Sequence, residues 1–454
     1  MSTIVAISTA PGIGGIGIIR MSGEQCFEIL NKVFKQKNAQ DIEDIKGYSI
    51  KYGHIFDNNS IIDEVLVSYF KAPKSYTAEN MCEINSHGGI VIMNKILDLC
   101  IKNGADLAEP GEFTKRAFLN GRLDLSQAEA VIDVINSKTD REAKVSIEQL
   151  EGNLSEKITK IRKTIISVMA DIEATIDYPE YDLEEVTNSK ISDILDNVDV
   201  LLDELEKSFY NGKILREGIS TAIIGKPNAG KSSLLNLILN EERAIVTDIE
   251  GTTRDTIEEF ISIEGIPLKI IDTAGIRNAS DEVEKIGVNK AKEIAKKSDI
   301  VIAIFDCNKQ LTNEDREILE LLKEKNAIIL LNKIDLTKNI QIEEIKKYDK
   351  PVVEISTKTR EGLDKLYKEI SDMFKLNEIA VDDEIIVSNE RHKTIIIKSK
   401  NNLDKARETI KNNMPIDIIS TYLKEIIEEL GKITGETVTE DVISEIFSKF
   451  CLGK

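Results

Sequence analysis

Several residue types are scarce in this chain, and each scarcity argues against a class of site. Tryptophan is absent and aromatic residues make up only 5% of the 454 residues, so a surface on which bases stack is not expected. The five cysteines form no C-x-x-C pair and there are only three histidines. These counts argue against a disulfide framework, a zinc site and a histidine-rich metal centre.

Long apolar runs and a signal sequence are also missing. The run at residues 300–305 (IVIAIF) is far shorter than the roughly 20 residues that span a bilayer. The first residues, MSTIVAISTAPGIGG, lack the charged and then apolar pattern of a signal peptide. We therefore expect a cytoplasmic protein without a membrane partner. The net charge of −20 argues against a surface that binds nucleic acid along its whole extent, although a local basic patch or a basic partner stays open.

Three kinds of pattern follow one another and predict a multidomain α/β protein. Residues 1–118 mix short strand-like runs with two helical stretches, and residues 119–214 and 378–454 are helical. Residues 215–377 alternate apolar strands with helices, as in a doubly wound parallel sheet. Because such a domain is complete in itself, we expect it to be inserted into one helical domain built from both flanking segments. Two separate small helical domains are the alternative.

The glycine-rich run at residues 11–17 (PGIGGIG) resembles a dinucleotide-binding loop at first sight. In that motif a helix must follow the glycines, whereas here the sequence continues as a strand. A glycine-rich turn between two strands is therefore the better interpretation. Further along, the absence of proline between residues 112 and 178 allows very long helices, and a bend is expected at Pro179.

The strongest motif is GKPNAGKS at residues 225–232, which fits G-x-x-x-x-G-K-[ST] between a strand and a helical run. Its glycines allow backbone N–H groups to face phosphates, Lys231 can reach the β- and γ-phosphate oxygens, and Ser232 can hold Mg²⁺. The motif predicts a nucleoside triphosphate site.

Three further motifs follow strands in the order that one guanine-nucleotide site requires. In DTAG (272–275), Asp272 can hold Mg²⁺ through water and the Gly275 amide can meet the γ-phosphate. In NKID (332–335), the Asp335 carboxylate can accept hydrogen bonds from guanine N1–H and the 2-amino group, which adenine does not offer. STK (356–358) can close over the base. Since all four motifs follow the carboxyl ends of strands, they predict one GTP site.

Two groups that GTP hydrolysis needs are not evident. Ile276 stands where Ras-type GTPases carry the glutamine that orients water, and position alone identifies no arginine finger. The segment at residues 245–255 (IVTDIEGTTRD) offers neutral oxygens at Thr247, Ile249 and Thr252. With Asn228 they could cage a monovalent cation beside the phosphates. A switch loop with only Thr253 on Mg²⁺ is the alternative.

Carboxylates just after DTAG are candidates for the group that handles the water. Asp281, Glu282 and Glu284 lie in SDEVEKIG, at residues 280–287. One of them could act as a general base or hold the water. The alternative is an ordinary helix N-terminus, where acidic residues are common.

At these residues the sequence resembles the MnmE (TrmE) family of tRNA-modification GTPases over essentially the whole chain. The resemblance rests on GKPNAGKSSLLN, IVTDIEGTTRD, IIDTAGIRNASDEVEKIG, the segment at 110–135 and the C-terminal FCLGK. It implies an N-terminal α/β folate-binding and dimerisation domain (1–118), a central helical domain (119–214 and 378–454) and an inserted Ras-like P-loop G domain (215–377).

The resemblance also implies the chemistry and the partners. As a homodimer, in a heterotetramer with an MnmG (GidA)-type flavoprotein that carries FAD, such proteins install an aminomethyl or carboxymethylaminomethyl group on the wobble uridine of certain tRNAs. The one-carbon unit comes from a tetrahydrofolate derivative (5,10-methylene or 5-formyl), and tRNA is bound mainly through the complex. GTP hydrolysis, activated by K⁺, drives a conformational cycle.

Site residues follow from the motifs and the resemblance. K⁺ ligands are Asn228, Thr247, Ile249 and Thr252, and Mg²⁺ ligands are Ser232 and Thr253. Glu284 matches the catalytic carboxylate, and Arg20, Glu83, Arg122 and Lys454 match folate contacts. Cys451 matches the family's C-terminal cysteine, which is either chemical or a small buried apolar residue. The expected GTP-binding residues are Asn228, Ala229, Gly230, Lys231, Ser232, Ser233, Thr247, Asp248, Ile249, Glu250, Gly251, Thr252, Thr253, Asp272, Thr273, Ala274, Gly275, Asn332, Lys333, Asp335, Ser356, Thr357 and Lys358.

Two other functions remain open at this point. A ribosome-assembly GTPase that only binds RNA would need a basic module after the G domain, whereas residues 380–454 have mixed charge. A GTP-dependent scaffold that leaves all chemistry to a partner is the second alternative.

Overall fold

The computed structural model describes residues 1–36, 47–177, 188–240, 244–245, 259–271, 293–375, 385–412 and 414–454. These residues form two compact units. One comprises Met1–Ile132, Gln149–Ile191 and Asn401–Lys454, and the other comprises Asp133–Glu148 and Ser192–Lys400. No helix within these ranges is long and apolar enough to cross a membrane. The bend predicted at Pro179 lies outside the described residues.

A seven-stranded sheet in the order β3-β4-β5-β6-β2-β1-β7 opens the first unit. Its strands are β1 (Ile4–Ile7), β2 (Gly14–Ser22), β3 (Phe34–Gln36), β4 (Ser49–Asp57), β5 (Ser60–Phe70), β6 (Met81–Gly88) and β7 (Asp106–Leu107). The β1–β7 pair is parallel and the other pairs are antiparallel. Since the glycine-rich run leads into β2, the predicted turn between strands is confirmed.

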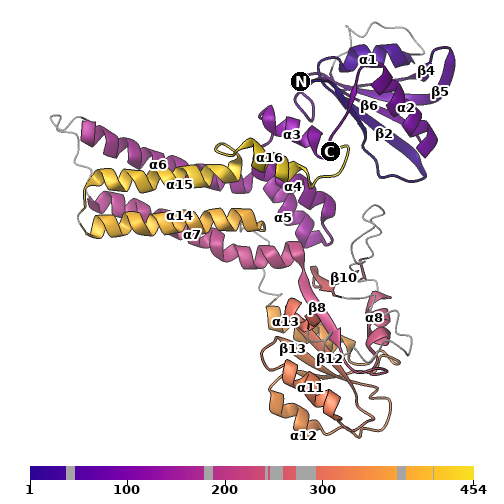
Figure 1. The fold of residues 1–454 in the computed structure, drawn as a ribbon, viewed down its shortest axis with the longest axis vertical. Coiled ribbons are helices and arrows are strands. Elements are labelled where there is room, and N and C mark those ends of the chain that lie inside the picture. Colours follow the sequence, from indigo (N-terminus) through magenta and orange to yellow (C-terminus); the bar gives the residue numbers. More distant parts are fainter. Residues whose placement is uncertain are drawn as a thin grey trace. The chain divides into compact units, whose positions relative to one another are not determined.

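Helices α1 (Cys26–Val33) and α2 (Ile90–Lys102) pack on this sheet and on each other (Figure 1). Alternate residues along the strands are buried beneath them, as period-2 strands with one covered face require. Ile19, Val67 and Ile84 from three neighbouring strands are fully buried in this core. Both helices lie within residues 23–35 and 89–102, where apolar residues at helical spacing predict helices.

Residues 112–177 form four helices instead of one or two very long ones. They are α3 (Glu112–Leu119), α4 (Leu125–Asn136), α5 (Asp140–Glu151) and α6 (Asn153–Asp177). A turn containing Gly121 separates α3 from α4, and Gly152 separates α5 from α6. The lack of proline therefore permitted a long helix only in α6, which has 25 residues.

Within the first unit, α6 runs beside α15 (Ile416–Thr434) although some 240 residues separate them (Figure 1). Buried Ile161 and Ile165 of α6 and Leu423 and Ile426 of α15 recur at helical spacing. Arg162 donates Nε–H to the carbonyl oxygen of Ile427 at 3.2 Å. Helices from before and after the inserted sheet therefore pack together, as their need for burial predicted.

The first unit ends in α16 (Glu440–Phe447) and a short tail. Phe447 and Phe450 are buried against Ala117 of α3 and Leu125 and Ala128 of α4. This apolar cluster anchors the C-terminal segment to the helices that follow the N-terminal sheet.

The second unit contains a sheet in the order β14-β13-β12-β8-β11-β10-β9. Its strands are β8 (Ile219–Ile224), β9 (Ala244–Ile245), β10 (Glu259–Ile263), β11 (Ile266–Ile270), β12 (Ile300–Asp306), β13 (Ala327–Asn332) and β14 (Val352–Glu354). The strands from β14 to β11 are parallel, and β10 is antiparallel to β11 and to β9. Crossover connections give the doubly wound arrangement that the alternating pattern predicted.

Both faces of this sheet are covered, which explains the continuous apolar strands. Ile302 and Ile304 of β12 face one core, and Val301 and Phe305 face the other. Helices α8 (Lys231–Leu239) and α13 (Leu363–Phe374) contribute to the first core. Helices α11 (Asn313–Leu321) and α12 (Ile342–Ile345) contribute to the second, and a 3₁₀ turn, η3 (Lys346–Tyr348), follows α12.

Helical residues from outside the predicted G domain also belong to the second unit. In it, α7 (Asn188–Glu217) lies beside α14 (Glu390–Lys411), and Lys400 forms ion pairs with Asp203 and Glu206. Val145 of α5 joins the core of the sheet. At the end of α7, Arg216 pairs with Asp133 at 2.9 Å.

Candidate functional site

The phosphate loop joins β8 to α8, so the first turn of α8 begins at the motif lysine. Gly230 has φ 113°, and a Cβ there would lie 2.1 Å from Nδ2 of Asn332. Only glycine permits both the backbone conformation and this close approach. The Lys231 ammonium donates to the carbonyl oxygens of Gly225 and Lys226, each at 2.8 Å, so its side chain lies along the loop.

Asn332, at the end of β13, connects the phosphate loop to the STK segment. Its side chain is fully buried. Nδ2 donates to the carbonyl oxygen of Ala229 at 2.8 Å, and Oδ1 accepts from the Thr357 N–H at 3.1 Å. One amide side chain therefore satisfies backbone groups of two loops and fixes their spacing.

The neighbouring residues of NKID are held by hydrogen bonds to the phosphate loop, to the end of β12 and to the STK segment. Lys333 donates from Nζ to the carbonyl oxygen of Asn228 at 2.9 Å and to Oδ2 of Asp306 at 2.7 Å. The Ser356 hydroxyl donates to Oδ1 of Asp335 at 2.7 Å, which orients that carboxylate. The strand ends thus bring the predicted residues of three motifs to one edge of the sheet.

Only some of the other residues predicted to bind the nucleotide lie within the described part of the chain. Ser232 and Ser233 lie in the first turn of α8, and Lys358 is exposed beside Thr357. The remaining predicted residues lie outside the described residues: Thr247, Asp248, Ile249, Glu250, Gly251, Thr252, Thr253, Asp272, Thr273, Ala274, Gly275 and Glu284.

A second cluster of predicted residues forms on the N-terminal sheet. Arg20 of β2 and Glu83 of β6 are register partners, and their side chains pair at 2.8 Å. Arg20 Nη1 also donates to the carbonyl oxygen of Gly453 at 3.1 Å. The arginine therefore joins two strands of the sheet to the C-terminal tail.

The tail itself is seated close to the first strand. A Cβ on Gly453 would lie 2.4 Å from the carbonyl oxygen of Ile7, and its φ is 84°, so glycine is required. Burial, and then the Arg20 guanidinium, lower the pKa of the Lys454 ammonium, whereas Glu83 raises it. Lys454 thus lies within electrostatic reach of the Arg20–Glu83 pair.

Cys451 is exposed, so the interpretation as a small buried apolar residue is wrong. Its carbonyl oxygen accepts from the Gly111 N–H at 3.2 Å. This bond connects the tail to the start of α3.

Tyr76 belongs to this cluster and was missed by sequence reasoning. The Arg20 and Arg122 guanidinium carbons lie 5.5 Å and 4.9 Å from its ring centroid. The surrounding run KSYTAEN contains no motif, so nothing local to the sequence indicates that Tyr76 meets two arginines. The four predicted residues Arg20, Glu83, Arg122 and Lys454 therefore lie close together beside β2 and β6, with Tyr76 and Gly453 among them.

The sheet order and the phosphate loop define a Ras-like P-loop GTPase domain inside a larger chain. Comparison with known proteins gives matches for the rest of the chain as well. A family model described as "GTP-binding protein TrmE N-terminus" matches residues 3–122, and one described as "MnmE helical domain" matches residues 125–451. Among solved structures, the G domain of the T. maritima FeoB iron transporter is 26% identical, with a TM-score of 0.26, over 34% of this chain and 98% of its own.

Curated relatives match from end to end. The tRNA modification GTPase MnmE of Acetivibrio thermocellus is 50% identical, covering 100% of this chain and 99% of its own. The protein of the same name from Clostridioides difficile strain 630 is 49% identical with the same coverage. The chain therefore belongs to the MnmE (TrmE) family of tRNA modification GTPases. The predicted fold class and GTP hydrolase class are confirmed, and the ribosome-assembly alternative is set aside.

Proposed function

We propose that this chain is a K⁺-activated GTPase whose hydrolysis cycle serves the modification of the tRNA wobble uridine with a folate-derived one-carbon unit. The observation that carries the folate part is the grouping of Arg20, Glu83, Arg122 and the C-terminal Lys454 beside strands β2 and β6 of the N-terminal sheet. The proposed domains are 1–118, 119–214 with 378–454, and 215–377, in a cytoplasmic protein.

The charges of that cluster suit a reduced folate. Two guanidinium groups and an ammonium can donate to carboxylates and to ring carbonyls, and the Glu83 carboxylate can accept from ring N–H groups. The lowered pKa of Lys454, caused first by burial and then by Arg20, favours a ligand that brings negative charge. The folate would supply a one-carbon unit, while these residues would bind and orient it.

In the G domain, Ser232 would hold Mg²⁺ together with Thr253, and Asn228 would hold K⁺ with Thr247, Ile249 and Thr252. The hydrogen bond from Lys333 Nζ to the Asn228 backbone carbonyl oxygen, at 2.9 Å, supports this role of Asn228, because it fixes the residue's backbone in the phosphate loop. K⁺ would supply the positive charge that an arginine finger supplies elsewhere, and Mg²⁺ would neutralise phosphate oxygens. Glu284 is the proposed catalytic carboxylate, and Cys451 is proposed to act in the modification site.

A homodimer through the N-terminal sheet is supported by apolar residues on its open face. Ile50, Tyr52 and Leu66 are 65%, 37% and 48% exposed, and Tyr52 and Leu66 are register partners of β4 and β5. Apolar side chains grouped on one sheet face commonly mark an interface. The further proposed partners are tRNA and an MnmG-type flavoprotein that carries FAD in a heterotetramer.

Reconstitution tests the proposal. The chain is combined with the flavoprotein, FAD, a tetrahydrofolate derivative, GTP, K⁺ and tRNA, and the nucleosides are measured by mass spectrometry. Omitting folate or GTP should abolish the modified uridine, and replacing K⁺ with Na⁺ at equal ionic strength should slow hydrolysis at least tenfold.

If the chain were only a scaffold that leaves all chemistry to its partner, the result would differ. Arg20→Ala would then leave the amount of modified uridine unchanged in the same mixture. Equal hydrolysis rates in K⁺ and Na⁺ would contradict the cation cage.

A further inference from the structure

Tyr76 receives two arginine side chains that come from different parts of the first unit. Arg20 comes from β2 and Arg122 from the turn after α3, and each guanidinium lies over the ring within about the 6 Å at which cation–π attraction acts. Two like charges close to one another repel, and an aromatic ring that attracts both offsets this repulsion.

The two arginines differ in how they are held. Arg20 is also fixed by Glu83 and by the carbonyl oxygen of Gly453. Arg122 is exposed, and within the described residues its guanidinium forms its hydrogen bond and its ring contact with Tyr76 only: Nη1 donates to the Tyr76 carbonyl oxygen at 3.1 Å, and the group lies over the ring. Without that ring, Arg122 would sample many rotamers, and a ligand would have to order it on binding.

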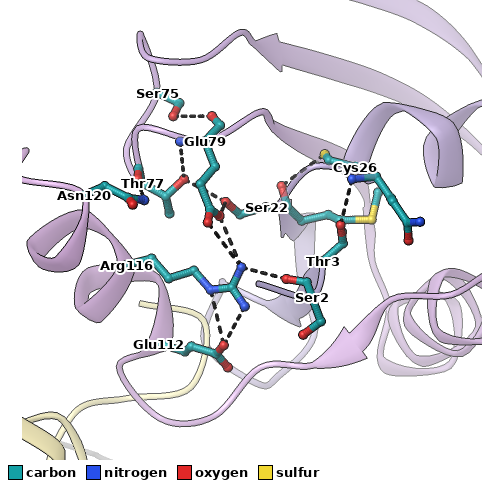
Figure 2. Close-up of polar contacts among 12 residues, drawn as sticks. Ser2, Thr3, Ser22, Cys26, Ser75, Thr77, Glu79, Glu112, Arg116 and Asn120 are labelled. Carbon is teal, nitrogen blue, oxygen red and sulfur yellow. Dashed lines mark hydrogen bonds and ion pairs between the residues drawn. The ribbon is translucent and has the colours of Figure 1, made fainter. Parts of the chain in front are cut away.

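Tyr76 is itself held from both sides. Its hydroxyl bonds the buried Thr114 hydroxyl at 2.8 Å. In the residues that follow, the Thr77 hydroxyl meets the Ser22 hydroxyl at 2.7 Å, and the Thr77 carbonyl oxygen accepts from Asn120 Nδ2 at 2.7 Å (Figure 2). The segment that carries the ring is therefore tied to β2 and to the end of α3.

Arg116 completes this support. Its side chain is 4% exposed and pairs with Glu79 at 3.2 Å and with Glu112 at 2.8 Å (Figure 2). It also donates to the carbonyl oxygen of Ser2 at 2.8 Å. Because Arg116 is buried, moving the Glu79 segment away from it would leave a buried charge without its partner. The ion pair therefore restrains the segment that carries Tyr76.

We propose that Tyr76 is a positioning residue of the folate site, holding Arg122 beside Arg20 before the ligand arrives. The inference rests on the proposed function of this cluster as a site for a reduced folate. Tyr76 acts through Arg122: the ring lowers the conformational entropy that Arg122 loses when a negatively charged ligand binds. The site therefore favours the binding of a ligand whose oxygen atoms can accept hydrogen bonds from two adjacent guanidinium groups.

Equilibrium binding of 5-formyltetrahydrofolate to the full-length chain, measured by calorimetry, tests this role. Tyr76→Leu should weaken binding at least tenfold, and Tyr76→Met, a second variant without the ring, should do the same. Tyr76→Phe keeps the ring and should lose less than threefold. Tyr210→Leu removes an exposed tyrosine of α7 and serves as the matched control.

A double-mutant cycle separates positioning from a general structural role. In the Arg122→Ala background, Tyr76→Leu should cost less than threefold, because the residue that it positions is gone. An equal loss in both backgrounds would overturn the inference, as would unchanged binding by Tyr76→Leu and Tyr76→Met. Failure of the unmodified chain to bind the probe would instead overturn the proposed folate site, and the inference with it.

Discussion

The hydroxyl of Ser8 donates to the carbonyl oxygen of Gly453 at 3.0 Å, joining residues that are 445 positions apart in the chain. Ser8 follows the first strand of the N-terminal sheet, and Gly453 is the penultimate residue. With the bonds from Arg20 to Gly453 and from Gly111 to Cys451, this contact holds the tail against the part of the N-terminal sheet that carries the proposed folate site.

Deletion of residues 451–454 should abolish wobble-uridine modification and spare K⁺-stimulated GTP turnover. The tail contributes Lys454 to the charged cluster, whereas the nucleotide motifs lie on the other sheet. Both activities are measured on the same truncated protein. Gly453→Ala, which places a Cβ against the carbonyl oxygen of Ile7, should reproduce much of the loss.

Leu452→Ala is the matched control for the tail, because Leu452 is 59% exposed. It should leave modification within about twofold of the unaltered chain. Surviving modification after the deletion would remove the tail from the folate site, and joint loss of both activities would make it a folding element.

Asp335→Asn should switch the nucleotide preference from GTP toward XTP. The carboxylate can accept from guanine N1–H and the 2-amino group, whereas an amide can accept from xanthine N1–H and donate from its NH2 group to the C2 carbonyl oxygen of xanthine. Competition binding of GTP and XTP measures the change, which we expect to exceed tenfold in the ratio of affinities.

Ser356→Ala tests how Asp335 is oriented. It removes the 2.7 Å hydrogen bond to the carboxylate but leaves the carboxylate in place. GTP affinity should fall by about tenfold or less, with guanine still preferred.

For the Asp335→Asn variant, an unchanged preference for GTP over XTP would show that Asp335 does not recognise the base.

Glu284→Ala should reduce GTP hydrolysis by at least a hundredfold and leave GTP affinity nearly unchanged. A group that positions or activates water acts in the transition state and contributes little to binding of the ground state. Single-turnover hydrolysis and nucleotide binding are measured in parallel. Asp281→Ala and Glu282→Ala are the neighbouring controls, and a matching fall in affinity and turnover would make Glu284 structural.

Glu142→Gln should make the stability of the second unit less dependent on pH. Burial raises the pKa of the Glu142 carboxyl to about 7, although the Lys138 N–H, which donates to it at 2.7 Å, opposes the shift. Since the folded pKa exceeds the unfolded value, the stabilising contribution is complete below about pH 4.5 and is lost as the pH rises through 7.

The measurement is the urea midpoint at pH 5 and pH 8.5. The glutamine variant keeps an acceptor for the Lys138 N–H and should gain on the order of 2 kcal/mol relative to the unaltered chain at pH 8.5, and much less at pH 5. Asp140→Asn, at the exposed start of the same helix and in the same unit, is the control. The same difference at both pH values would show that Glu142 titrates normally in the folded protein.

Much of the G domain could be predicted from the sequence because its signals are local. Apolar runs of strand length, followed by GKPNAGKS or NKID, report that a strand ends and a ligand loop begins. The parallel order of β12, β13 and β14 then follows, since each is joined to the next through a helical stretch. The buried Asn332 that joins two of these loops was predicted only as a GTP-binding residue.

Other boundaries could not be predicted locally. The absence of proline from residues 112–178 permits long helices, but turns containing Gly121 and Gly152 divide the segment into shorter ones. The exposure of Cys451 could not be predicted locally either. Burial of a side chain depends on which other segments pack against it in the fold and not on the residue type alone.

The sequence by itself determined the GTP motifs, the alternation of the inserted sheet and the resemblance that placed Arg20, Glu83, Arg122 and Lys454 in one site. These depend on residue type and on spacing over a few residues. Only the tertiary structure decided that Tyr76 lies under two arginines and that Gly453 meets Ser8. Such contacts join segments whose separation along the chain leaves no periodic trace, and they form because burial and charge pairing bring those segments together on folding.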